Sequence, residues 1–179
     1  MITTENTALV LIDVQEKLVP AMHDKEALLN NLKKMVKGAR ILGLPILLTE
    51  QNPAGLGPTV PEIAELLPEE KPVSKFSFSS CGTEQFIEEL KAVNRQNILI
   101  VGMEAHVCVY QTAADLVNLN YDVQVVADAV ASRTLENKKI GLEKSKAAGA
   151  GITSTEIALF ELVKIAKGDK FKEIIKIVK

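Results

Sequence analysis

Several kinds of residue are scarce in this chain of 179 residues. It contains no tryptophan, two tyrosines, five phenylalanines and two histidines. So few aromatic rings argue against a platform that stacks the bases of single-stranded nucleic acid. The two cysteines, Cys81 and Cys108, lack the spacing of a metal site, and a disulfide framework is not expected in a chain of this size without a secretion signal. The sequence therefore predicts free thiols in the reducing cytoplasm, with no metal ion and no cofactor.

Long apolar runs and blocks of basic charge are also missing. No run approaches the ~20 apolar residues that span a bilayer, and residues 1–6 lack the basic start of a signal peptide. The formal net charge of -2 is spread along the chain, so no basic patch favours nucleic acid. We expect neither a membrane nor a nucleic acid as a partner.

What the chain does contain is a regular alternation of two patterns. Short runs rich in Val, Ile and Leu alternate with helical patterns, which is typical of βαβ units around a parallel sheet. At this length we expect a single domain over residues 1–179 that buries about 70% of its unfolded surface. The expected strands are 8–12, 46–49, 72–74, 98–101, 123–126 and 152–153, and the expected main helices are 27–42, 83–92, 108–119, 135–148 and 156–167. Together these elements predict a three-layer α/β/α fold around a six-stranded parallel sheet.

Three residues that carry chemistry follow the ends of expected strands. Asp13 closes the first strand, Lys75 follows the third, and the segment 102–108 follows the fourth and ends at Cys108. In open α/β sheets the functional site lies beyond the carboxyl ends of the strands, where the strand order reverses. If the first and fourth strands are neighbours there, the three side chains converge.

Cys108 is the best single candidate for chemistry. It stands at the expected start of a helix, where unpaired N–H groups and the helix dipole favour negative charge. A thiol in this position is expected to lose its proton more easily, and the thiolate is the nucleophile. Asp13 can accept that proton and return it to a leaving group, while the Lys75 ammonium stabilises both charges. The trio suits acyl transfer or amide hydrolysis, with backbone N–H groups of the loop as oxyanion donors.

Each of the three residues also has a structural interpretation. Cysteine is among the most buried residue types, so Cys108 alone is compatible with simple packing. Asp13 is compatible with a turn or a helix cap, and a lone lysine such as Lys75 is usually solvated. The functional interpretation therefore depends on the meeting of three strand ends.

The motifs, taken in order, resemble the isochorismatase-like cysteine hydrolase superfamily. They are Leu-Ile-Asp-Val-Gln at 11–15, Lys75, and Gly-Met-Glu-Ala-His-Val-Cys-Val at 102–109, and the resemblance extends over 128–133 and 149–156. The resemblance implies the strand order 3-2-1-4-5-6. It also implies a triad with Asp13 as general base and acid, Lys75 as electrostatic partner and Cys108 as nucleophile.

The resemblance further implies a cis peptide bond before Ala105, between Glu104 and Ala105. That bond is expected to orient the backbone N–H groups of Ala105 and Cys108 into an oxyanion hole. Many relatives have threonine where this chain has Ala105, but a backbone donor does not depend on the side chain.

Four residues near these motifs are candidates for the substrate pocket: Gln15, Phe76, Glu104 and His106. Phe76, like Phe78, is equally compatible with the core or a pocket wall, and His106 with a hydrogen-bonded residue at the loop edge. Cys81 is more easily explained by structure than by redox chemistry.

The branch of the superfamily is narrowed by the lack of histidine. Nicotinamidases of this superfamily bind a metal through an Asp-x-His pattern after the second strand and a further histidine. Residues 48–57 of this chain contain no histidine, which argues against a metal-dependent nicotinamidase. Isochorismatase itself cleaves a vinyl ether and needs no thiol nucleophile. Cys108 therefore favours a small amide-like or ureide-like substrate and a thioester intermediate. A vinyl-ether hydrolase and a non-catalytic scaffold stay open as alternatives.

A receiver-like signalling module has a similar architecture but requires paired acids after the first strand and a phosphorylatable aspartate after the third. Here Asp13 is followed by Val14 and Gln15, and the third strand ends at Lys75, so the pattern does not fit.

The resemblance to the hydrolase superfamily implies a small-molecule substrate and a homo-oligomer, a dimer or larger.

Overall fold

The sheet that organises the molecule is all parallel, and its strand order is β3-β2-β1-β4-β5-β6. The computed structural model describes all residues from 1 to 179. The strands are β1 (Thr7–Ile12), β2 (Ile46–Gln51), β3 (Val73–Lys75), β4 (Asn97–Met103), β5 (Asp122–Ala131) and β6 (Gly151–Thr153). The expected fold and the strand order that the resemblance implies are both confirmed.

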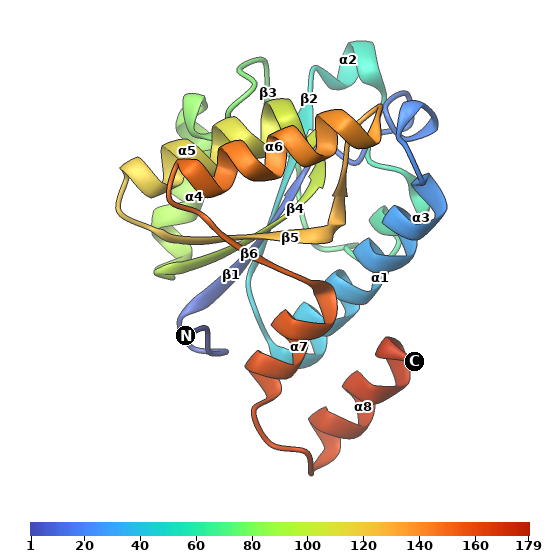
Figure 1. Cartoon of the computed structure of the whole chain (residues 1–179), viewed down its shortest axis with the longest axis vertical. Coiled ribbons are helices and arrows are strands. Elements are labelled where there is room, and N and C mark those ends of the chain that lie inside the picture. Colours follow the sequence, from blue (N-terminus) through green and yellow to red (C-terminus); the bar gives the residue numbers. More distant parts are fainter.

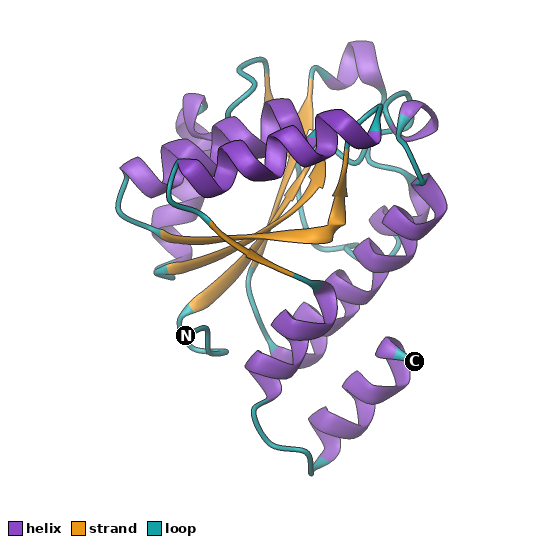
Figure 2. Ribbon diagram, in the orientation of Figure 1, coloured by secondary structure: helices purple, strands orange, loops and turns teal.

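Helices cover both faces of this sheet (Figures 1 and 2). The longer ones are α1 (Lys25–Leu42), α4 (Glu84–Val93), α5 (Tyr110–Asn118), α6 (Leu135–Ala147), α7 (Thr155–Val163) and α8 (Asp169–Val178). Shorter ones are α2 (Pro53–Leu56), α3 (Pro61–Ala64) and the turns η1 (Val19–Ala21), η2 (Ser80–Gly82) and η3 (Ala105–Val109). Residues of α1, α7 and α8 pack into one core cluster, and residues of α4 and α5 pack into the other.

The alternation of side chains along β1 explains why its sequence is continuously apolar. Leu9 and Leu11 belong to the core on the α1 side, whereas Ala8, Val10 and Ile12 belong to the core on the α5 side. Successive side chains of a strand point to opposite faces, so a strand covered on both faces needs apolar residues throughout. All six residues of β1 are buried. The strand is thereby fixed in the centre of the molecule, directly before Asp13.

The carboxyl end of β4 meets β1 through a glycine. Gly102 pairs with Ile12, and its φ of +118° is a backbone conformation that residues other than glycine rarely adopt. A Cβ at Gly102 would lie 2.1 Å from the Ile12 carbonyl oxygen. Only glycine fits here, which brings the end of β4 against the residue before Asp13.

The largest differences from the sequence-based expectation are at the ends of β5 and α7. Strand β5 continues to Ala131 instead of ending near 126, because after a register shift at 100/102 it pairs again with β4 through Val130 and Ala131. Helix α7 ends at Val163 instead of 167, since Lys164 has a φ of 61°. The helix expected at 83–92 begins one residue later, at Glu84, because Thr83 has an extended backbone; the Thr83 side chain makes no capping hydrogen bond.

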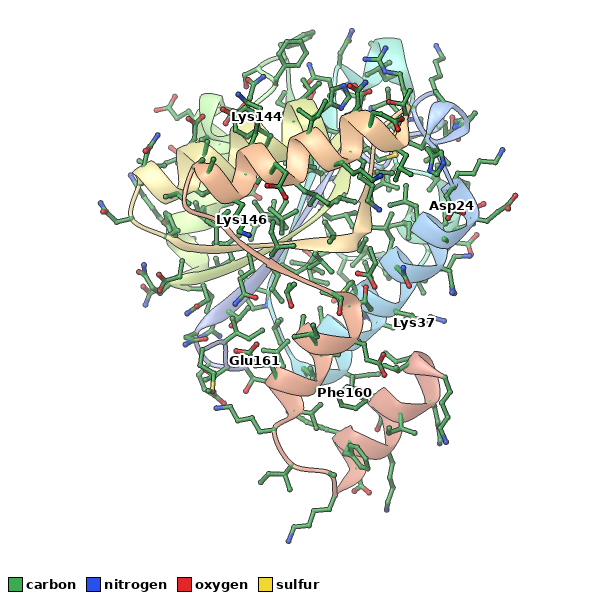
Figure 3. The ribbon with its side chains drawn as sticks, viewed as in Figure 1. Asp24, Lys37, Lys144, Lys146, Phe160 and Glu161 are labelled. Atoms are coloured by element: carbon green, nitrogen blue, oxygen red, sulfur yellow. The ribbon has the colours of Figure 1, made fainter.

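The C-terminal helix α8 packs against α1. Lys34 on α1 donates a hydrogen bond to the carbonyl oxygen of Val178 at 2.9 Å. At the other end of the chain, the Ile2 N–H donates to Glu161 at 3.0 Å, and Figure 3 labels Glu161 on α7. None of the helices combines the length and the apolar character that crossing a membrane requires.

Candidate active site

The three residues expected to converge come from the carboxyl ends of three strands. Asp13 follows β1, Lys75 is the last residue of β3, and Cys108 lies in the turn η3 after β4. Strand β1 lies between β2 and β4, so the strand order reverses beside Asp13. The Lys75 ammonium lies 2.7 Å from Oδ2 of Asp13. The side chains of Lys75 and Asp13 are completely buried.

A lysine is needed to bridge the distance from β3 to β1. Lys75 pairs in register with Gln51 on β2, and β2 separates β3 from β1. Adjacent strands lie about 4.8 Å apart, so the backbones of β3 and β1 are roughly 10 Å apart. The four-carbon side chain of Lys75 crosses the end of β2 and places its charge on Asp13.

The Asp13 carboxylate is held by a second neighbour. Thr49 on β2 donates its hydroxyl proton to Oδ1 of Asp13 at 2.8 Å, and Asp13 itself has a φ of 53°. Aspartate tolerates this left-handed conformation better than most residues. Burial raises the pKa of Asp13 above its ordinary value, while the Lys75 charge and the hydrogen bonds from Lys75, Thr49 and Cys108 oppose that rise. Both oxygens of the carboxylate are thus engaged, and its position is fixed.

The Cys108 thiol is also buried, and it is 6% exposed. Burial and the Asp13 charge raise its pKa to about 12, against a smaller lowering by the Lys75 charge. The expectation that a helix start makes this thiol more acidic is therefore wrong. The physical reason is that loss of water and a facing carboxylate outweigh the dipole of a short turn. At neutral pH the thiol keeps its proton until a base removes it, and Asp13 is the adjacent base.

The raised thiol pKa values predict a loss of stability at alkaline pH. Burial raises the pKa of Cys108 to about 12 and that of Cys81 to about 11, whereas thiols of an unfolded chain titrate near ~8.5. Above that pH the unfolded state loses thiol protons that the folded state keeps, so the free energy of unfolding falls as pH rises. We expect a fall of about 3–4 kcal/mol between pH 8 and pH 10, roughly 2 kcal/mol for each thiol, measured by urea unfolding. The double variant Cys81→Ala/Cys108→Ala should show a smaller fall, and equal falls would contradict the prediction.

The loop after β4 contains a non-proline cis peptide bond, between Met103 and Glu104. The expected position, between Glu104 and Ala105, is wrong by one residue. Met103 ends β4, Glu104 is extended, and the helical turn begins at Ala105, so the change of direction falls at the strand end. Ala105 and Cys108 are both buried in this turn. Their role as backbone oxyanion donors stays a prediction.

The turn η3 is supported by close contact with α6. A Cβ at Gly141 of α6 would lie 2.5 Å from the carbonyl carbon of Ala105 and 2.6 Å from the backbone nitrogen of His106. We expect Gly141→Ala to destabilise the protein by about 1–3 kcal/mol, although alanine favours helices. Thermal unfolding and activity should both report the change, since the backbone of the turn must move.

Gly38→Ala on α1 is the matched control for this substitution. Its added Cβ would meet the tip of the Leu159 side chain, at 2.3 Å from Cδ2, which can rotate away. We expect the control to leave activity unchanged. Full activity and stability in Gly141→Ala would contradict a rigid contact between α6 and the turn.

Three of the candidate pocket residues, Gln15, Glu104 and His106, form hydrogen bonds within the protein. Gln15 is fully buried, and its amide contacts backbone groups of β2 and of the loop after it. Glu104 accepts a hydrogen bond from Nε of Arg133 at 2.8 Å, and Nδ1 of His106 lies 2.9 Å from Oγ of Ser132. These contacts tie η3 to the end of β5. A substrate contact by these residues stays a prediction.

Phe76 and Phe78 flank the segment after Lys75 and lie at the surface. Phe76 is 77% exposed and Phe78 is 56% exposed. A place in the core is therefore ruled out for both. Their backbones contribute instead. The Phe78 carbonyl oxygen, like that of Ser77, accepts a hydrogen bond from the Lys75 ammonium, and the Phe76 carbonyl oxygen accepts one from Gln51.

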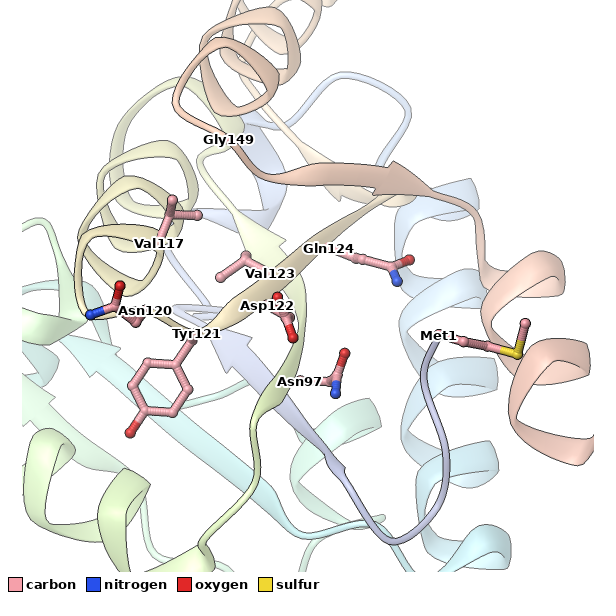
Figure 4. Close-up of a pocket in the computed structure, with 9 residues that line it drawn as sticks. All are labelled: Met1, Asn97, Val117, Asn120, Tyr121, Asp122, Val123, Gln124 and Gly149. Atoms are coloured by element: carbon pink, nitrogen blue, oxygen red, sulfur yellow. The ribbon is translucent and has the colours of Figure 1, made fainter.

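No cavity of the structure is lined by Asp13, Lys75 or Cys108. The largest cavity, of about 520 Å³, lies at the amino-terminal ends of the strands, opposite the candidate site, and is shown in Figure 4. Its walls include Asn97 and Asp122, the first residues of β4 and β5. Of the three residues, Cys108 keeps the largest exposed fraction.

Thr49 and Gln51 are site residues that the sequence analysis missed. Thr49 holds Asp13, and Gln51 accepts a hydrogen bond from Lys75 at 2.8 Å. Their position at the end of the second strand was the available signal, since all carboxyl ends of a parallel sheet meet at one edge. No group of three or more His, Cys, Asp or Glu side chains in the structure is arranged to hold a metal ion.

Comparison with known proteins gives one consistent result. The model of the isochorismatase domain matches residues 7–157. Isochorismatase domain-containing protein 2 of Danio rerio is 39% identical over 179 residues, which covers 99% of this chain and 89% of that protein. The structure of MAR1 ribonuclease from Caenorhabditis elegans has a TM-score of 0.93 at 36% identity and covers 99% of this chain and 91% of that one. YcaC from Pseudomonas aeruginosa, in a structure with hexane-2,5-diol and covalent acrylamide, has a TM-score of 0.93 at 25% identity, with 98% and 90% covered.

Proposed function

The chain belongs to the isochorismatase family of hydrolases, and from that premise we propose that it is a metal-independent cysteine hydrolase of small amides. The observation that carries the proposal is a buried Asp13–Lys75 ion pair facing a buried thiol. For stability alone, two well-packed apolar side chains would serve as well as a buried ion pair. A fully buried acid, a cation and a thiol at the switch point of the sheet are better explained by chemistry.

The proposed reaction begins with transfer of the Cys108 proton to Asp13. The sulfur then attacks the carbonyl carbon of the substrate, and the oxyanion is stabilised by backbone N–H groups of Ala105 and Cys108. Asp13 returns its proton to the leaving nitrogen as the C–N bond breaks, which leaves a thioester on Cys108. Water, deprotonated by Asp13, attacks the thioester and releases the acid and the thiol.

Lys75 is not the proton donor in this scheme. Its ammonium donates to Asp13, Gln51 and two backbone carbonyl oxygens. Its role is to hold a positive charge beside groups that exchange a proton. The thiol is protonated at rest, so base catalysis by Asp13 is required for each attack.

The covalent acrylamide in the P. aeruginosa relative supports a reactive nucleophile in this fold. Acrylamide is an electrophile that thiols attack at its terminal alkene carbon, which leaves its amide intact. The test is a panel of small amides and ureides, with release of ammonia or amine measured against Asp13→Asn as the inactive control. We expect hydrolysis of at least one panel member by the unaltered protein alone.

Two other activities are tested in the same panel. One relative is a ribonuclease by name, so an RNA oligonucleotide is included, although the net charge of -2 does not favour a polyanion. A vinyl ether tests the isochorismatase reaction. Cleavage of RNA or of the vinyl ether without hydrolysis of any amide would overturn the proposal, and inactivity toward all three classes would favour a scaffold.

The remaining predictions concern assembly and location. We propose that the protein acts on a small molecule as a cytoplasmic homo-oligomer, a dimer or larger. Light scattering after gel filtration should give a mass at least twice the monomer's 19.5 kDa.

A further inference from the structure

Gln51 lies where β2 passes between the two members of the ion pair. It is the last residue of β2 and the register partner of Lys75 on β3. Its Oε1 accepts a hydrogen bond from the Lys75 ammonium at 2.8 Å, and its Nε2 donates to the carbonyl oxygen of Phe76 at 2.9 Å. One amide therefore holds both the ammonium of Lys75 and the backbone that follows it.

The acceptors around Lys75 show what the amide contributes. The ammonium has three protons and four acceptors: Asp13 at 2.7 Å, Gln51 at 2.8 Å, Phe78 O at 3.1 Å and Ser77 O at 3.3 Å. Asp13 is the only charged acceptor. The Gln51 oxygen is neutral, so it fixes the direction of the ammonium without drawing positive charge away from Asp13.

Gln51 is itself held by a second buried amide. Oε1 of Gln15 accepts from the Gln51 backbone N–H at 2.8 Å, and Nε2 of Gln15 donates to the Gln51 carbonyl oxygen at 3.0 Å. The same Nε2 donates to Gly57 O at 2.7 Å. Gln15 thus continues the pairing of the sheet with its side chain and fixes the backbone of Gln51.

We propose that Gln51 is a positioning residue that aims the Lys75 ammonium at Asp13, and that Gln15 acts on the pair through Gln51. The inference rests on the proposed function only for its effect on catalysis. Its structural content is that the ion pair is oriented by a neutral amide from the strand between its members.

The charge of the residue at this position matters as much as its hydrogen bonds. A glutamate here would have nearly the same shape and would keep an acceptor for Lys75. Its negative charge would compete with Asp13 for the ammonium and would lie close to the Asp13 carboxylate. A methionine would keep the approximate volume and remove both hydrogen bonds. The methionine variant therefore measures the loss of the hydrogen bonds, and the glutamate variant measures the effect of an added negative charge.

The test is the titration of Asp13 in Gln51→Met and Gln51→Glu, read from the carboxyl ¹³C chemical shift in protein labelled at aspartate. Asp13→Asn assigns the signal. Because Lys75 lowers the pKa of Asp13, a less directed ammonium should let that pKa rise. We expect an upward shift of about one pH unit in Gln51→Met and a larger one in Gln51→Glu. Gln15→Met should shift it in the same direction by less.

Gln85→Met is the matched control, since Gln85 is an exposed glutamine that also donates from Nε2, to Glu89. It should leave the Asp13 titration unchanged. An unchanged Asp13 titration in folded Gln51→Met and Gln51→Glu would overturn the inference. If Gln51→Met does not fold, Gln51→Glu, which keeps an acceptor for Lys75, gives the decisive titration.

Kinetics separate this inference from the proposed function. With an amide substrate in hand, Gln51→Met should lower kcat by about 10- to 100-fold with KM changed by less than about threefold, as expected for a misdirected group. If no amide is hydrolysed by the unaltered protein, the proposed function fails, and the Asp13 titration still decides whether Gln51 aims Lys75. If amides are hydrolysed but the Asp13 titration is unchanged in the Gln51 variants, the proposed function is supported and the positioning role of Gln51 is wrong.

Discussion

Replacing Cys108 by serine is expected to lower kcat/KM for the amide substrate by at least ~10³-fold. The serine hydroxyl has nearly the shape of the thiol, but it is a much weaker acid and a weaker nucleophile. Asp13 already faces a thiol whose pKa is raised to about 12, and a hydroxyl would demand far more of the same base. The measurement is the steady-state rate of amine release at pH 7.5.

Cys81→Ser is the control for this substitution. Cys81 is a partly buried thiol of η2 with a pKa raised to about 11, and the proposed reaction does not use it. We expect its activity within about twofold of the unaltered protein. Circular dichroism and thermal unfolding should show that both serine variants are folded. A folded Cys108→Ser variant with full amidase activity would remove the thiol from the mechanism.

Replacing Lys75 by methionine is expected to cost about 3–5 kcal/mol of the free energy of unfolding at pH 7. The change leaves the Asp13 carboxylate completely buried with only neutral partners. Without the lysine the pKa of Asp13 rises further, so protonation restores part of the lost stability at lower pH. The deficit should therefore shrink as pH falls from 7 to 5, as measured by urea unfolding at each pH.

The double variant Asp13→Asn/Lys75→Met tests whether this cost comes from the broken pair. Asparagine tolerates the left-handed backbone of Asp13, and its amide oxygen can still accept from Thr49. Removing both charges should restore at least about 2 kcal/mol relative to Lys75→Met. A double variant no more stable than Lys75→Met would show that the loss arises from packing. Both variants should lack hydrolase activity.

Much of the fold could be predicted because apolar strands and amphipathic helices have different periods. Strand β1, buried on both faces, was recognisable as a continuous apolar run. The strand order was not contained in these patterns and came from the resemblance of the motifs. The extension of β5 to Ala131 depended on a register shift against β4, which is a property of strand pairing and not of local sequence.

The candidate site was predictable in its residues but not in its electrostatics. Asp13, Lys75 and Cys108 were identifiable because each follows a strand end. The raised pKa of Cys108 was not, since it depends on burial and on the distance to a carboxylate 95 positions away in the chain. Thr49 and Gln51 were missed because hydroxyl and amide side chains at a strand end carry no distinctive spacing.

Trapping of the thioester on Cys108 would decide directly whether the thiol is the nucleophile. The protein is mixed with an amide that it hydrolyses, quenched in acid during turnover, and examined by intact-mass and peptide mass spectrometry. We expect an acyl group of the substrate on the peptide that contains Cys108, and none on Cys81. Turnover in which no acyl group accumulates on Cys108, together with retained activity in Cys108→Ser, would rule out the thiol mechanism.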